Sequence, residues 1–481
     1  MPGPLRLAVR VLAFAIVLSC GDEPISPTPS RAAGLGFRVE PSRTEGTVSI
    51  RPAPQVAILD QFGDTVSDAT NTVTVALEGN ANGATLSGIT TVRAEGGVAT
   101  FADLRIDRPG SSYRLVATAE GLAGAASAGF RISLTFTAVS AGVDLTCAIT
   151  TAQAAYCWGN NAYGELGDGT SNRSAIPQLV AVPAGVRFKA LSPGGGHTCA
   201  LSADGAAYCW GNGGLLGNGT TTPSASPLLV SAPQGARFVT LSTGGALTCG
   251  IIQGGDAYCW GANSYLGELG DGTTESRTSP VRVAVPTVVR FNTVSPGPSH
   301  SCGVTTYNEI YCWGWNSGPT PVIVAMPEGV TPEATGVGLA HTCMVTTAGA
   351  VYCWGDNVKG QLGDGTNEPR ATPTPVAAPA GVSFASLQVG SEYTCALTAE
   401  GAAYCWGSGA LGDSTITGPT PSPVPVAAPP GVRFSQLTAG DNHACGLTAD
   451  GAAYCWGSNA FGQLGNGVID GFTPAPVQVV Q

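Results

Sequence analysis

Fifteen cysteines are the residues of this 481-residue chain with the clearest chemical potential. Fourteen of them form seven pairs, and the two members of every pair stand ten positions apart: Cys147 with Cys157, Cys199 with Cys209, Cys249 with Cys259, Cys302 with Cys312, Cys343 with Cys353, Cys395 with Cys405, and Cys445 with Cys455. Zinc sites favour close pairs such as C-x2-C, and redox sites use C-x-x-C, so neither pattern is present. Structural disulfides are therefore the leading interpretation, and buried free thiols that pack as small apolar groups are the alternative.

The four histidines of the chain all stand two residues before the first cysteine of a pair, at His197, His300, His341 and His443. A ring of metal ligands is one interpretation of this spacing. Side chains alternate along a strand, however, so each histidine shares a face with its own cysteine and lies apart from the other histidines. Other repeats have Leu145, Leu247 or Tyr393 at the same position, which an apolar side chain therefore fills equally well. We expect packing between repeats, with no metal and no cofactor.

The sequence offers no catalytic constellation. It has no G-x-S-x-G elbow, no Walker loop and no H-E-x-x-H motif, and all four histidines have a structural interpretation. Leu-Gly-Asp-Gly-Thr loops carry Asp168, Asp271 and Asp364, but one aspartate per loop is too few for a calcium loop and is typical of a turn. Carboxylates from distant repeats can meet on one face, yet no particular pair stands out. We predict a non-enzyme without catalytic residues.

The cysteine pairs belong to a longer internal repeat. Tyr-Cys-Trp-Gly recurs at the second cysteine of every pair, at intervals of about 50 residues. Asp204-Gly205 lies midway between Cys199 and Cys209, where a hairpin turn places the two cysteines opposite each other, about 5 Å apart and within disulfide reach. An alternating segment precedes each hairpin, and a glycine loop with a proline-flanked segment follows it. Four short strands per repeat are typical of a β-propeller blade.

Residues 158–170, which read WGNNAYGELGDGT, and residues 354–366, which read WGDNVKGQLGDGT, resemble the RCC1 (regulator of chromosome condensation) repeat. The resemblance covers residues 134–481 in seven repeats and implies a seven-bladed β-propeller that serves as an interaction platform. Repeats two and six have shortened loops, and the fourth runs from Trp313 to Pro319 without the Leu-Gly-Asp-Gly-Thr loop. Trp315, in that shortened repeat, is our candidate partner contact, with gap-filling as the alternative. We expect residues 476–480 to complete the first blade.

The N-terminal third predicts export. Arg6 and Arg10 precede an apolar run over residues 11–18 that is too short to span a bilayer, so residues 1–19 are interpreted as a signal peptide. The Leu-Ser-Cys segment ending at Cys20 resembles a bacterial lipobox, which implies a lipid on Cys20; ordinary cleavage nearby is the alternative. Residues 20–33 form a proline-containing tether. Residues 34–133 contain short alternating strands similar to those of bacterial immunoglobulin-like domains.

The predicted fold class is therefore all-β, a seven-bladed RCC1-like propeller preceded by an immunoglobulin-like sandwich. The net charge of −11 and the absence of clustered Lys or Arg argue against nucleic-acid binding. We predict an exported, lipid-anchored, monomeric envelope or surface protein that docks an unidentified protein or envelope glycan on its propeller. A self-assembling structural surface component and a polysaccharide hydrolase or lyase are the alternatives.

Overall fold

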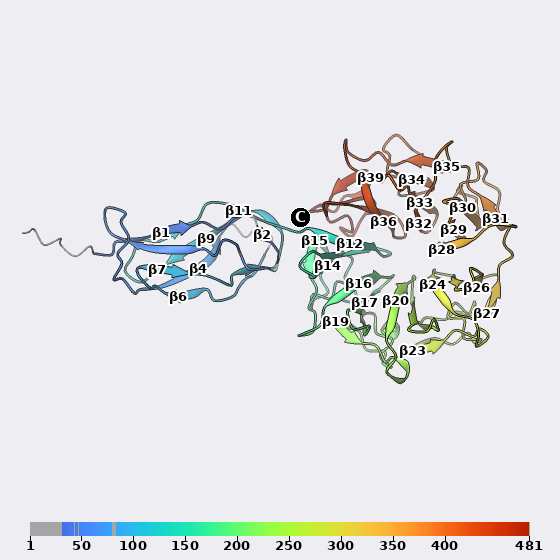
Figure 1. Ribbon diagram of the computed structural model, residues 1–481, viewed down its shortest axis with the longest axis horizontal. Coiled ribbons are helices and arrows are strands. Elements are labelled where there is room, and N and C mark those ends of the chain that lie inside the picture. The colour runs from blue at the N-terminus through green and yellow to red at the C-terminus, as the bar shows by residue number, and fades with distance from the viewer. Residues whose placement is uncertain (1–30, 43, 47, 79–82, 481) are drawn as a thin grey trace, which may run out of the picture.

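The chain folds almost entirely into strands. The structure, a computed structural model, describes residues 31–42, 44–46, 48–78 and 83–480 (Figure 1). The predicted signal peptide over residues 1–19, the lipidation site Cys20 and most of the predicted tether lie outside the described residues. Within these ranges no helix is long and apolar enough to cross a membrane.

Residues 34–133 form a β-sandwich. One sheet has the strand order β1-β3-β7, and the other has the order β2-β11-β9-β4-β6, with β10 beside β9 and a small β5-β8 ladder. Val56, Val73, Leu115 and Phe130, drawn from both sheets, are buried together between them. The strands are β1 (Gly34–Val39), β2 (Thr44–Glu45), β3 (Gln55–Leu59), β4 (Thr72–Glu78), β5 (Leu86–Ser87), β6 (Thr91–Arg93), β7 (Val98–Thr100), β8 (Arg105–Ile106), β9 (Gly110–Thr118), β10 (Ala125–Ala126) and β11 (Phe130–Ser133). Membership of the immunoglobulin-like type stays a prediction.

The remaining described residues form seven four-stranded antiparallel sheets, arranged as the blades of a ring (Figure 1). This confirms the predicted seven-bladed propeller. Blades 1 to 3 comprise β12 (Phe136–Ala141), β13 (Leu145–Thr150), β14 (Ala155–Gly159), β15 (Ser174–Leu179); β16 (Phe188–Pro193), β17 (His197–Ser202), β18 (Ala207–Gly211), β19 (Ser224–Leu229); and β20 (Phe238–Thr243), β21 (Leu247–Ile252), β22 (Ala257–Gly261), β23 (Arg277–Arg282). Two short 3-10 turns, η1 (Gly213–Leu215) and η2 (Pro233–Gly235), flank β19.

Blades 4 to 7 repeat the same order of strands, so every blade is one continuous stretch of chain. They comprise β24 (Phe291–Pro296), β25 (His300–Thr305), β26 (Ile310–Gly314), β27 (Gly318–Ile323); β28 (Pro332–Val337), β29 (His341–Thr346), β30 (Val351–Gly355), β31 (Arg370–Pro375); β32 (Ser386–Val389), β33 (Tyr393–Leu397), β34 (Ala403–Gly407), β35 (Thr420–Pro425); and β36 (Phe434–Ala439), β37 (His443–Thr448), β38 (Ala453–Asn459), β39 (Gly471–Gln478).

A disulfide joins the second and third strands of every blade. The two cysteines of each pair are register partners, as Cys199 on β17 and Cys209 on β18 illustrate. The Cα atoms of the partners lie 4.0–4.1 Å apart in all seven bridges, which join Cys147 to Cys157, Cys199 to Cys209, Cys249 to Cys259, Cys302 to Cys312, Cys343 to Cys353, Cys395 to Cys405, and Cys445 to Cys455. The pairing is the one predicted from the ten-residue spacing, because a hairpin with a central turn brings equidistant residues face to face. These fourteen cysteines are therefore not buried free thiols, which was the alternative interpretation.

The ring does not close as expected from the sequence. The C-terminal strand β39 pairs with β38 in the seventh blade, so the prediction that residues 476–480 complete the first blade is wrong. The chain enters the propeller on the innermost strand β12, which leaves blade 1 complete without an added strand. Closure comes instead from contacts between blades 7 and 1. Gln436 exchanges hydrogen bonds with the Val139 backbone, and the Phe136 N–H donates to the Gly451 carbonyl.

Candidate functional site

One face of the ring carries the long loops of the blades. The turn between the first and second strands and the loop between the third and fourth strands both open on this face, as residues 142–144 and 160–173 do in blade 1. We call it the loop face. The N-terminal sandwich contacts blade 1 near the opposite face, where Asp107, Val48 and Arg105 approach Tyr156 and the 152–154 turn. In Figure 1 the sandwich lies beside the ring and leaves the axial opening uncovered.

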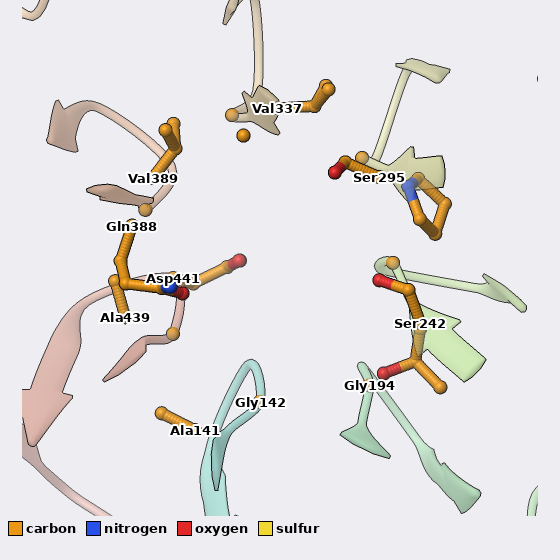
Figure 2. A pocket seen from close by; sticks show the side chains of 18 of the residues that line it. Ala141, Gly142, Gly194, Ser242, Ser295, Val337, Gln388, Val389, Ala439 and Asp441 are labelled. Atoms are coloured by element: carbon orange, nitrogen blue, oxygen red, sulfur yellow. The ribbon is translucent and has the colours of Figure 1, made fainter. Parts of the chain in front are cut away.

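The axial channel opens on the loop face and has a volume of about 270 Å³ (Figure 2). Its wall is built from the equivalent position of each innermost strand: Ser140, Ser192, Ser242, Ser295, Gly336, Gln388 and Thr438. Five of these seven positions carry a hydroxyl group, and hydroxyl groups here join neighbouring blades. The Ser192 hydroxyl lies 2.9 Å from that of Thr243, and the Thr438 hydroxyl accepts the Ala141 N–H at 2.9 Å.

Asp441 is the charged residue of the channel wall, and Figure 2 shows its side chain reaching from the rim toward the opening. Burial raises the pKa of its carboxyl group, and a hydrogen bond from Ser391 opposes the rise. Burial, followed by the charges of Asp441 and Glu165, also raises the pKa of Asp144. Among the described residues, no group of three or more His, Cys, Asp or Glu is placed to hold a metal ion.

The four histidines lie between blades, each hydrogen-bonded to a threonine of the next blade. The Nε2–Oγ1 distances are 2.7 Å for His197 to Thr248, 2.8 Å for His300 to Thr342, 3.1 Å for His341 to Thr394 and 2.8 Å for His443 to Thr146. The Thr146 hydroxyl donates its proton to the Gln463 carbonyl, so His443 must donate from Nε2. Burial lowers the pKa of His443 to about 3, which keeps its ring neutral. The four histidines therefore pack between blades, which is the interpretation that the sequence favoured.

The tryptophan of each Tyr-Cys-Trp-Gly segment, which we call the register tryptophan, holds its blade to the loop of the preceding blade. Six of these tryptophans are fully buried: Trp158, Trp210, Trp260, Trp313, Trp406 and Trp456. The glycine of each preceding Leu-Gly pair lies against the indole; a Cβ on Gly363, for example, would come within 2.6 Å of Trp406 Nε1. Trp406 Nε1 donates to the Gln361 carbonyl at 3.0 Å. The tryptophans therefore form the inter-blade core.

Trp354 in blade 5 is the register tryptophan that differs, because the blade-4 loop that would cover it is missing from the sequence. Its side chain is only partly buried. A groove of about 780 Å³ opens there on the loop face, between blades 4 and 5. We call it the junction groove; its lining includes Trp315, Val324, Thr342, Trp354 and Ala371. Trp315, our candidate contact residue, lies on its rim and is 38% exposed.

This difference predicts unequal effects for two otherwise identical substitutions. Trp406→Phe removes the hydrogen bond to Gln361 and leaves a gap in a closed core, so we expect a loss of about 2–3 kcal/mol in unfolding free energy. Trp354→Phe lies in an open groove and is expected to cost less than about 1 kcal/mol. Chemical denaturation of both variants measures the two values, and equal losses would contradict this account of the groove.

These features define a class of protein: a disulfide-stapled seven-bladed propeller with a polar axial channel. Comparison with known proteins identifies the family. The RCC1-like domain matches residues 216–481, and RCC1 repeats match residues 154–201, 136–165 and 188–215. The chain belongs to the RCC1-like family.

Relatives match parts of this chain and leave its ligand open. The ultraviolet-B receptor UVR8 of Arabidopsis thaliana is 28% identical over 280 residues, which is 58% of this chain and 54% of UVR8. The probable E3 ubiquitin-protein ligase HERC4 of Homo sapiens is 36% identical over 74 residues, which is 15% of this chain and 7% of HERC4. The chain therefore spans about half of UVR8 and a small part of HERC4.

Two solved structures share the propeller. Prp20p of Saccharomyces cerevisiae, described with its binding properties to Gsp1p and histones, superposes with a TM-score of 0.59 at 20% identity and covers 72% of this chain and 87% of its own. Human WBSCR16 superposes with a TM-score of 0.60 at 20% identity, over 68% of this chain and 94% of its own. At this identity the likeness concerns the fold alone.

Proposed function

We propose that this protein is a non-enzymatic interaction protein that docks a partner protein on the loop face of its propeller. The observation that carries the proposal is the distribution of exposed apolar side chains. The loop face presents Tyr163, Tyr265, Trp315, Leu339, Val358, Val468 and Ile469. Toward the opposite face, the comparable exposed residues of the described propeller are Val288 and Tyr307 on turns and links, with Leu229, Val239 and Ile323 at strand ends. Exposed apolar and aromatic residues that gather on one face are typical of interaction surfaces.

The proposal includes export and a lipid anchor on Cys20. Seven disulfides support export, because such bridges form and persist in oxidising compartments. An anchored chain with the sandwich beside blade 1 keeps the loop face free for a partner at the cell envelope. Family membership supports the binding role, since Prp20p is described by its binding to Gsp1p and histones.

A pair of matched variants tests the docking face. The full chain with Tyr163→Ser, Tyr265→Ser and Trp315→Ser is compared with the chain carrying Val288→Ser and Tyr307→Ser on the opposite face. All five side chains are exposed, so both variants should fold like the parent protein. Each chain is immobilised and exposed to envelope extract of the source cells, and retained proteins are identified by mass spectrometry. We expect the loop-face variant to lose about tenfold or more of the retained partner. Equal retention by both variants would rule out the loop face.

A further inference from the structure

Four junctions between blades share one hydrogen-bonding arrangement. A main-chain carbonyl in the loop of one blade accepts two bonds from the next blade, one from the register tryptophan Nε1 and one from a serine or threonine hydroxyl. The carbonyls and their donors are Glu165 with Trp210 and Thr198, Glu268 with Trp313 and Ser301, Gln361 with Trp406 and Thr394, and Gln463 with Trp158 and Thr146. The donor distances range from 2.7 to 3.2 Å. The two donors thus bind a main-chain carbonyl oxygen and not a side chain.

The residues that follow the carbonyl complete the contact. The next residue is a fully buried leucine, such as Leu362, which lies with the disulfide sulfur of Cys353, Val376 and the tryptophan of the next blade. The glycine after it lies flat on the indole, and the second glycine donates its N–H to the outermost strand of the next blade. Gly365, for example, donates to the Pro421 carbonyl at 2.8 Å. Carbonyl, leucine and two glycines thus form one recognition unit.

At the junction of blades 4 and 5, the residues that would bind this recognition unit are present, although blade 4 has no loop that supplies the unit. Thr342 and Trp354 occupy the two donor positions, and Ala371 of β31 occupies the position of Pro421. Cys312 and Val324 stand where the leucine packs in other blades. Cys312 is 6% exposed, whereas every other paired cysteine is at most 1% exposed, as expected for a leucine subsite without its leucine.

We propose that the junction groove binds an exposed loop of a partner protein with the sequence pattern leucine-glycine-Asx-glycine, which takes the place of the missing blade-4 loop. The proposal rests on the docking function above and names the chemistry of the partner at one point of the loop face. The groove is a continuation of the inter-blade interface, where the same contacts are made within the chain. A second copy of this protein is a poor donor, because the leucines of its own leucine-glycine loops are fully buried.

A glycan is the competing ligand, since Trp315 and Trp354 offer aromatic rings in an open groove. The geometry favours a peptide for two reasons. The two donors converge on one carbonyl oxygen at four other junctions, and a flat indole without a Cβ above it suits glycine. A bound sugar would need several polar partners for its hydroxyl groups around the aromatic rings. The polar groups identified in the groove, Thr342, Trp354 and Ala371, are instead equivalent to those that bind backbone at the other junctions.

A synthetic peptide of residues 359–368, KGQLGDGTNE, tests the proposal against the full chain by fluorescence anisotropy. We expect saturable binding, and we expect the same peptide with Gly363→Ala to lose at least about tenfold in affinity, because a Cβ there meets the indole and the glycine φ is +69°. In the protein, Trp354→Phe keeps an aromatic ring but loses the indole N–H and should weaken binding about fivefold. Trp260→Phe is the matched control. Trp260 Nε1 also lacks a partner among the described residues, but its ring is covered, so this variant should bind normally.

A loop graft provides a second test that does not depend on a tryptophan variant. Replacing residues 315–317 with the sequence of residues 356–369 gives blade 4 the loop of blade 5. We expect a higher unfolding temperature and loss of peptide binding.

Peptide binding that survives the graft, or that is equal for the Gly363→Ala peptide, would overturn the proposal. Binding of a cello-oligosaccharide that Trp354→Phe abolishes, without peptide binding, would overturn it in favour of a glycan. If the peptide fails while the loop-face variant above still loses its partner, the docking function stands and this inference falls.

Discussion

A fully reduced chain is expected not to fold its propeller. Each disulfide closes a loop of ten residues and is expected to stabilise the folded state by about 3 kcal/mol, mainly by restricting the unfolded chain. Seven such bridges contribute about 20 kcal/mol, which exceeds the net stability of about 5–15 kcal/mol typical of folded proteins. A ring cannot lose this contribution and stay closed, since every blade is affected alike.

The measurement is refolding with and without disulfides. The chain is denatured, reduced and alkylated on its cysteines, and its near-ultraviolet circular dichroism is compared with that of chain denatured and refolded with its bridges intact. We expect native signal only from the oxidised chain. A Cys20→Ser chain treated in the same way controls for modification of Cys20, the cysteine outside the seven pairs. Recovery of the native spectrum by the alkylated chain would show that the bridges are dispensable.

The second large effect is acid destabilisation through the buried histidines. Burial lowers the pKa of His197 and His300 to about 4 and that of His341 and His443 to about 3. Below the ordinary histidine pKa of 6.5 the unfolded chain binds protons that the folded chain refuses, so stability is complete above pH 6.5 and falls as the pH drops toward 4. Four such residues give a limiting slope of about 5 kcal/mol per pH unit.

Calorimetric unfolding between pH 7 and pH 4 measures this slope. The variant with all four histidines replaced by leucine, the residue that Leu145 and Leu247 provide at the same position, should lose most of the pH dependence. The raised carboxyl pKa values of Asp144 and Asp441 act in the opposite direction, because protonation then favours the folded state. They remain in both proteins and cancel in the comparison. Identical pH profiles for variant and parent would refute the histidine explanation.

The sequence was sufficient for the local structure because the repeat pattern specifies it. Ten-residue spacing with a central turn determines which cysteines face each other, and the repeated Tyr-Cys-Trp-Gly segment determines the number of blades. The way the ring closes could not be predicted, since strand patterning is the same whether the last strand joins blade 7 or blade 1. That choice depends on contacts between blades 7 and 1, such as those of Gln436 with the Val139 backbone, which leave no distinctive sequence pattern.

The junction groove had a signal that sequence reasoning did not use. The missing blade-4 loop and the tryptophan of the following repeat were both visible, but their relation was not, because only the structure shows that each loop covers the tryptophan of the next blade. Trp315 was selected for its position outside the repeat and lies on the rim of this groove. Trp354, Thr342 and Ala371 carry the donors and the acceptor of the groove, and their residue types do not distinguish them from the same positions in other repeats.

Photo-cross-linking from the two faces of the propeller tests the central claim most directly. A photoreactive amino acid replaces Tyr265 on the loop face in one chain and Tyr307 on the opposite face in another; both side chains are exposed, at 87% and 72%. Each chain is irradiated in envelope extract of the source cells, and cross-linked proteins are identified by mass spectrometry. We predict one specific partner protein cross-linked from position 265 and absent from position 307. A partner trapped from position 307 alone, or none from either position, would contradict docking on the loop face.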